Sequence, residues 1–248
     1  MKWLMTIFSA CLLAGCCTDC YLSGYTEDKI HDVTIGRDLE RDGSYGKVRI
    51  YVPDEKYATE KIPFIVYFRG PESEDGLGPL IEYIDKEENP AIVMIVPYGT
   101  NDNERAMLAL GVEDYLTNRL KAGRTAIDPR RIYVTGFGKG GYEAWKFALE
   151  NTELISTVAP VCGGPDAGKG YRDPDVPVAM TDINVWAIQY VDDPVVNNDY
   201  AKKIVTAIWT QNLGLARITE FLEGGHTPEI YKNRVFLDWI FGTVKAKE

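Results

Sequence analysis

Short apolar runs and longer amphipathic segments alternate along most of this chain. Apolar runs rich in β-branched residues predict buried strands at residues 62–68, 91–96, 131–135, 155–161, 184–191 and 216–222. Segments with apolar residues at helical spacing lie between or after them, at residues 76–86, 101–122, 140–149, 199–210 and 228–241. This alternation predicts an α/β fold, with a mainly parallel, doubly wound sheet and helices on both faces. Two weaker strand patterns, at residues 32–35 and 47–52, would add an antiparallel edge.

The N-terminal segment has the layout of an export signal, because its apolar run is too short to span a bilayer. It ends in the sequence LAGC at residues 13–16, which resembles a bacterial lipobox. That resemblance implies removal of residues 1–15 and a diacylglycerol group on Cys16. A lipidated tether over residues 16–28 and a folded domain over residues 29–248 would follow. The expected location is the bacterial cell envelope, with a lipid anchor in the outer membrane or at the cell surface. An ordinary secretory signal is the alternative.

Charge and cysteine content narrow the possible partners. The formal net charge is −10, which disfavours nucleic acid because phosphate binding needs a positive surface. Two histidines without clustered ligand spacing predict no metal site, and no cofactor is expected. Cys17 and Cys20 can pair with each other or be acylated, and their spacing does not decide between these states. We interpret Cys162 as a small buried apolar residue at a strand end.

The run at residues 131–142 carries the most specific pattern. An apolar strand leads into Gly136-Phe137-Gly138-Lys139-Gly140, and a helical pattern follows. This is the context of a nucleophile elbow, G-x-S-x-G, in which a strained strand-to-helix turn presents a serine. Gly138 occupies the position of that serine. The sequence therefore predicts a serine-hydrolase scaffold that lacks its nucleophile.

An acid and a histidine follow in the order that such a scaffold requires. Asp193 lies at the end of a predicted strand and precedes Pro-Val-Val, which suits an acid loop, and Asp192 is the alternative. His226 follows two glycines at the end of the last predicted strand, whereas His31 lies far from these loops in sequence. We therefore predict an Asp193–His226 pair.

Several short motifs are spread over residues 45–242: RIYVTG at 131–136, GGYEAW at 140–145, APVCGG at 159–164, WA at 186–187, DPVV at 193–196 and GH at 225–226. Together they resemble the secreted esterase and predicted-peptidase branch of the α/β-hydrolases, which is related to polyhydroxybutyrate-depolymerase-like and feruloyl-type esterases. The resemblance implies one α/β-hydrolase domain without a large lid. It also implies that Gly138, Asp193 and His226 occupy the nucleophile, acid and histidine positions.

The chain departs from the family pattern at more than the nucleophile. The family's His-Gly after the third strand is Arg69-Gly70 here, and Pro71 follows. Proline has no N–H with which to bind an oxyanion, although the N–H of Lys139 remains. Loss of one such donor typically lowers the rate by about 10²–10³. Independent losses of this kind favour natural loss of catalysis.

Three hypotheses about function remain open at this point. The first is a catalytically inactive, lipid-anchored esterase homologue that binds a small ester, a saccharide-derived ligand, a peptide or a protein partner. The second is a carboxylic-ester hydrolase in which Asp193 and His226 activate water in place of serine. The third is a structural subunit of an envelope complex.

Overall fold

The computed structural model describes residues 29–37, 44–54, 57, 60–72, 75–86, 89–123, 125–164, 182–210 and 216–245. The predicted signal, the lipidation site Cys16, the tether, and Cys17 and Cys20 lie outside these residues. In the part of the chain that the structure describes, every helix is too short or too polar to span a bilayer.

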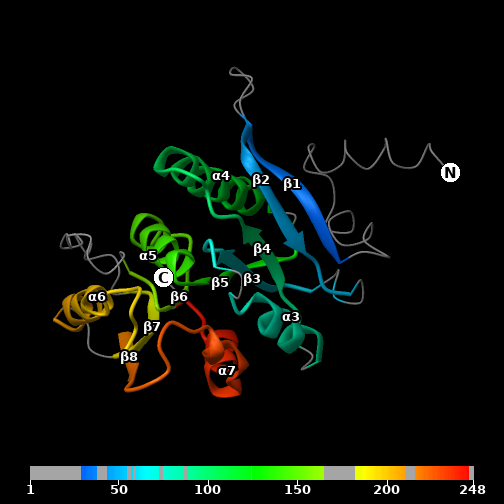
Figure 1. Ribbon diagram of the computed structural model, residues 1–248. Helices are drawn as coiled ribbons and strands as arrows, with labels where there is room; N and C mark the ends of the chain where they lie inside the picture. Colours follow the sequence, from blue (N-terminus) through cyan, green and yellow to red (C-terminus); the bar gives the residue numbers. More distant parts are fainter. Residues whose placement is uncertain are drawn as a thin grey trace.

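Eight strands form one sheet (Figure 1). In chain order they are β1 (Ile30–Arg37), β2 (Ser44–Tyr51), β3 (Ile62–Phe68), β4 (Ile92–Val96), β5 (Ile127–Phe137), β6 (Thr157–Val161), β7 (Asn184–Tyr190) and β8 (Ala216–Phe221). Their order across the sheet is β1-β2-β4-β3-β5-β6-β7-β8. β1, β2 and β4 pair antiparallel, and all the remaining pairs are parallel. The predicted fold class is therefore confirmed, including the antiparallel edge.

Helices cover both faces of the sheet. The helices are α3 (Leu77–Lys86), α4 (Asp102–Lys121), α5 (Lys139–Glu150), α6 (Asp199–Trp209) and α7 (Arg234–Gly242). α4, α5 and α6 share one apolar cluster with one face of the sheet, and α3 and α7 share a second cluster with the other face. β3 supplies both, because Phe64 and Val66 point to the first cluster while Ile65 and Tyr67 point to the second. Because both faces of these strands are buried, their sequences are apolar without interruption.

The prediction of one closing helix over residues 228–241 is wrong. A short 3-10 helix, η3 (Glu229–Lys232), is followed by a separate α7. Asn233 divides them, because its extended backbone ends the first and its side chain accepts hydrogen bonds from the N–H groups of Val235 and Phe236. The apolar spacing continues across this break, so periodicity alone does not show it.

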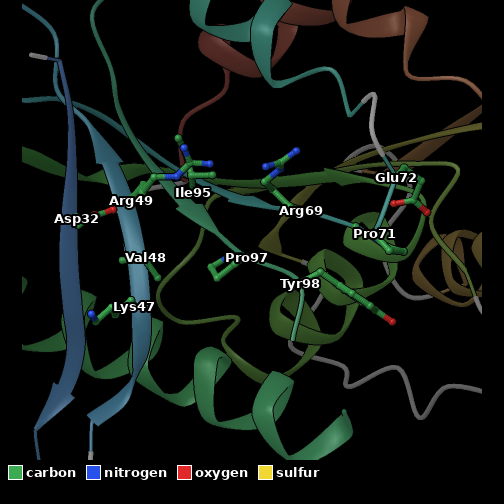
Figure 2. Close-up of a pocket in the computed structure, with 11 residues that line it drawn as sticks. Asp32, Lys47, Val48, Arg49, Arg69, Pro71, Glu72, Ile95, Pro97 and Tyr98 are labelled. Carbon is green, nitrogen blue, oxygen red and sulfur yellow. The ribbon is translucent and has the colours of Figure 1, made fainter. Parts of the chain in front are cut away.

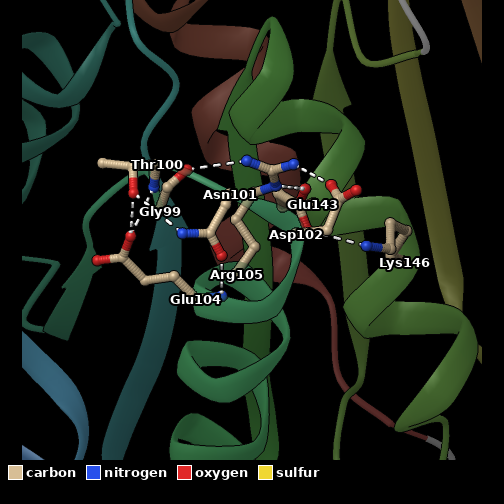
Figure 3. A network of polar contacts seen from close by, with 8 residues as sticks. All are labelled: Gly99, Thr100, Asn101, Asp102, Glu104, Arg105, Glu143 and Lys146. Atoms are coloured by element: carbon tan, nitrogen blue, oxygen red, sulfur yellow. Dashed lines mark hydrogen bonds and ion pairs between the residues drawn. The ribbon is translucent and has the colours of Figure 1, made fainter.

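A polar network fixes the loop after β4 to α5 (Figure 3). Arg105 of α4 donates to the carbonyl of Gly99 at 2.9 Å, and its Nε lies 3.2 Å from the Glu143 carboxylate of α5. Glu143 also pairs with Lys146 at 3.3 Å. Only 16% of the Arg105 side chain and 12% of that of Glu143 are exposed, so this contact is shielded from water. The Arg105 guanidinium lies 5.0 Å from the centre of the Tyr98 ring. The network therefore holds Tyr98 at the carboxyl end of β4.

We expect the Arg105→Met variant to lower the free energy of unfolding by about 1–3 kcal/mol, because it leaves one oxygen of the shielded Glu143 carboxylate and the Gly99 carbonyl without their donor. Arg234→Met is the matched control. Arg234 lies 3.5 Å from Asp238, and 65% and 51% of these two side chains are exposed, so we expect a change within about 0.5 kcal/mol. Urea denaturation measures both. Equal losses in the two variants would contradict a structural role for the network.

Candidate active site

The turn between β5 and α5 is a tight strand-to-helix turn centred on Gly138, the predicted nucleophile position. Gly138 has φ 58° and ψ −122°, a conformation that side chains rarely adopt. Its N–H donates to the carbonyl of Val161 at 3.0 Å, and its carbonyl accepts from the N–H of Tyr142 at 3.1 Å. The turn is thus fixed to β6 and to α5, with the Cα of Gly138 at the carboxyl edge of the sheet.

The structure brings Asp193 and His226 together at this edge. His226 Nδ1 lies 2.8 Å from Asp193 Oδ2, and the Asp193 side chain is fully buried. Asp193 Oδ1 accepts the N–H groups of Val195 at 2.8 Å and Val196 at 3.0 Å. These bonds orient the carboxylate toward the imidazole, as in the acid–histidine pair of a triad.

The neighbouring Asp192 has a different role. Its carboxylate accepts the N–H of Gly224 at 3.1 Å and that of Gly225 at 2.8 Å. Asp192 therefore positions the loop that carries His226. Within the described residues, its carboxylate forms no hydrogen bond with the imidazole.

Glu72 occupies the space into which a side chain at position 138 would extend. A Cβ built on Gly138 would lie 2.5 Å from Glu72 Oε1 and 2.9 Å from His226 Nε2. A Cβ on Gly70 would lie 1.7 Å from Glu72 Oε2. Both distances to Glu72 are far shorter than real Cβ contacts. The two glycines thus form a cradle for this carboxylate.

The Glu72 carboxylate also meets the groups that would act on a substrate. The N–H of Lys139 donates to Glu72 Oε1 over 3.5 Å, and His226 Nε2 lies 3.8 Å from the same oxygen. Pro71 is exposed in the same loop and supplies no N–H. The predicted oxyanion residues Gly70, Pro71 and Lys139 are therefore adjacent to Glu72, and the remaining donor already faces a carboxylate.

The carboxylates on both sides of His226 set its protonation state. Burial disfavours the imidazolium, but hydrogen bonds to Asp193, Cys162 and Glu72 outweigh it and raise the pKa of His226 to about 11. Burial likewise opposes ionisation of Glu72 and Asp193, yet their hydrogen bonds to His226 and to backbone N–H groups leave the pKa of each carboxyl below its usual range. His226 is therefore an imidazolium at neutral pH, and an imidazolium cannot accept a proton as a general base.

Cys162 lies beside the pair at the end of β6. Its backbone φ is 46°, its thiol donates weakly to the carbonyl of Thr227 at 3.8 Å, and burial raises the pKa of the thiol. Donor atoms of Cys162, Asp193 and His226 lie within 4.8 Å of one another. A metal ion there would need a thiolate and a neutral imidazole. Metal binding would therefore have to displace the proton of the thiol and that of the imidazolium.

Two residues of this site were missed from the sequence. Cys162 was interpreted only as a buried apolar residue, although its place at a strand's carboxyl end was a usable signal. Nothing in the sequence separated Glu72 from the other acids of its loop. Arg69, which replaces the family's histidine, pairs with Asp75 through its Nε.

No protein-family model and no curated protein matches the sequence. Solved structures match the fold. A thermostable esterase superposes with a TM-score of 0.69 at 21% identity, over 88% of this chain and 64% of the esterase. An acylaminoacyl peptidase from Pyrococcus horikoshii gives a TM-score of 0.60 at 15% identity, over 88% of this chain and 42% of the peptidase. An α/β-hydrolase enzyme from a deep-sea metagenome library gives a TM-score of 0.61 at 16% identity, over 86% of this chain and 98% of that enzyme.

The chain thus spans less than two thirds of the length of the first two structures and nearly all of the third. The structure has the α/β-hydrolase fold, which these esterases and peptidases share.

We expect Gly138→Ala to destabilise the protein more than Gly123→Ala. Both glycines have positive φ, 58° and 68°, but a Cβ on Gly123 would meet nothing within 4 Å. A positive φ costs a residue with a Cβ about 1–3 kcal/mol at either position, and contact with Glu72 and His226 adds about 1–3 kcal/mol at Gly138. Urea denaturation measures the difference. If the two variants lose the same stability, Glu72 does not fill the space above Gly138.

We expect His226 to remain protonated from pH 6 to pH 9, because its pKa is raised to about 11. Imidazole ¹⁵N NMR shifts during a pH titration report the state directly, and a His31→Gln variant assigns the signals. The raised pKa stabilises the fold fully below the unfolded-state pKa of about 6.5, and this stabilisation is lost as pH rises toward 11. The Glu72→Gln variant should lower the midpoint of the His226 titration, because it removes one of the carboxylates that raise its pKa. A midpoint near 6.5 in the native chain would contradict the ion pair.

Proposed function

We propose that this chain is a non-catalytic relative of the secreted esterase and predicted-peptidase branch, and that it binds a small ligand or a partner. The missing serine closes the route through a covalent acyl-enzyme, because glycine has no oxygen with which to attack a carbonyl. This proposal uses the motif resemblance together with the fold.

The observation that carries the proposal is the position of the Glu72 carboxylate. It lies where the nucleophile would be, faces the N–H of Lys139, and forms an ion pair with His226. A carboxylate there repels an oxyanion and keeps the imidazole protonated. Loss of serine, loss of an N–H at Pro71 and loss of a free base thus all act against the same reaction.

The alternative of a water-based hydrolase has less support. It requires His226, oriented by Asp193, to take a proton from water. The raised pKa of His226 leaves almost no neutral imidazole at pH 7. A purely structural subunit remains the second alternative, and ligand binding distinguishes it from our proposal.

We also propose that lipid on Cys16 anchors the domain to the bacterial envelope. The support is the sequence LAGC at residues 13–16 after a short apolar run. The tether over residues 16–28 would then separate the domain from the membrane surface, and the ligand would be met outside the cytoplasm.

Hydrolysis of p-nitrophenyl acetate and butyrate tests the proposal. We expect the native chain and Gly138→Ser to show only the buffer rate, since Glu72 blocks a serine side chain. The triple variant Gly138→Ser, Glu72→Ala, Pro71→Ala should exceed the buffer rate, because it restores the nucleophile, the space and one N–H, the last worth about 10²–10³ in rate.

His226→Ala in the triple background is the control and should remove the gained activity. Native turnover that is lost in His226→Ala would overturn the proposal in favour of the water-based mechanism. A folded but inactive triple variant would contradict the placement of Gly138 at a nucleophile position.

A further inference from the structure

A cavity of about 580 Å³ opens next to Glu72 at the edge of the sheet. Its walls come from β1, β2 and the loops after β3 and β4 (Figure 2). Glu72 and Pro71 line one side, whereas Gly138 and His226 do not line the cavity. Because of this arrangement, Glu72 stands between the cavity and the acid–histidine pair.

The cavity presents two cations for which the described part of the chain supplies no ion-pair partner. Lys47 and Arg49 of β2 are exposed, and neither has an ion-pair partner among the described residues. Asp32 faces Arg49 across the β1–β2 ladder but forms no ion pair with it in the described structure. Figure 2 shows Arg49 and Arg69 extending into the same part of the cavity.

Arg69 adds a third, partly engaged cation. Its Nε pairs with the nearly buried Asp75, while 32% of its side chain remains exposed. The second carboxylate of the lining, Glu72, is committed to His226. Among the described lining residues, Lys47 and Arg49 have no ion-pair partner and Arg69 is paired with Asp75, while Asp32 is the one carboxylate outside an ion pair, in a chain whose formal net charge is −10.

The remaining lining is suited to the uncharged part of a ligand. Pro71, Pro97 and Tyr98 contribute apolar and aromatic surface opposite the basic groups. A concave site that combines such surface with a few fixed charges is the usual form of a small-molecule site. Field lines from the cations are focused in a concavity, which raises the local concentration of anions.

We propose that this cavity binds a small ligand through a carboxylate or phosphate group held by Arg49 and Arg69, with Lys47 adding positive charge at the other end of the lining. The inference rests on the proposed non-catalytic function and specifies its ligand as an anion. Guanidinium groups suit both anions, because their planar donors match carboxylate and phosphate oxygens.

Isothermal titration calorimetry with three related sugars tests this inference on the full chain. Glucuronate carries a carboxylate, glucose 6-phosphate carries a phosphate, and glucose carries neither. We expect at least one of the two anions to bind and glucose not to bind, and the tighter anion identifies the preferred group. Arg49→Gln should weaken binding by about tenfold, the effect of losing a bond of about 1.4 kcal/mol to a charged group.

Two further variants test the direction of the effect on affinity. Asp32→Asn should tighten binding, because it removes the free carboxylate beside Arg49. Lys121→Gln, at an exposed lysine at the end of α4 outside the cavity, should leave binding unchanged. Binding of glucose as tight as that of the anions, or native affinity in Arg49→Gln, would overturn the proposal, as would the absence of heat from both anions up to about 10 mM.

This outcome is independent of ester turnover. Absence of both turnover and anion binding would remove the cavity proposal alone. Turnover by the native chain together with anion binding would remove the non-catalytic function and leave the cavity as an anion site.

Discussion

The arrangement at the carboxyl edge of the sheet depends on one buried imidazolium between two carboxylates. His226 meets Asp193 through Nδ1 and Glu72 through Nε2, so it joins the loops after β7, β8 and β3. Backbone N–H groups of Val195 and Lys139 offset part of the remaining negative charge. Asp193 accepts the hydrogen bond from Nδ1, whereas Glu72, 3.8 Å from Nε2, contributes through its charge. The cation thus links three loops at this edge of the sheet through its contacts with two carboxylates.

The strained turn at Gly138 persists although it presents no nucleophile. Its N–H and carbonyl are bonded to β6 and α5, so the backbone cannot relax without loss of both bonds. Glycine tolerates these dihedrals at little cost, and the absence of a Cβ makes room for Glu72. The glycine at position 138 and the carboxylate above it are therefore mutually dependent. The same loop also presents Pro71 and Glu72 to the cavity beside β2.

Most of the fold could be predicted because buried strands and amphipathic helices leave direct patterns in the sequence. The pairing of Asp193 with His226 followed from chain order, but only the loop geometry assigns Asp192 to the glycine N–H groups. Glu72 could not be predicted, because the direction of a loop side chain depends on packing that no local pattern records. The break at Asn233 was missed for a related reason, since a side-chain cap leaves apolar spacing unchanged.

A double-mutant cycle between Glu72 and His226 tests the central claim most directly. The unfolding free energies of the native chain, Glu72→Gln, His226→Gln and the double variant are measured at pH 7. We expect a favourable coupling of about 1–3 kcal/mol, because the two groups form a shielded ion pair. Additivity within about 0.5 kcal/mol would contradict it, because Glu72 would then occupy the place of the serine without holding His226 as an imidazolium.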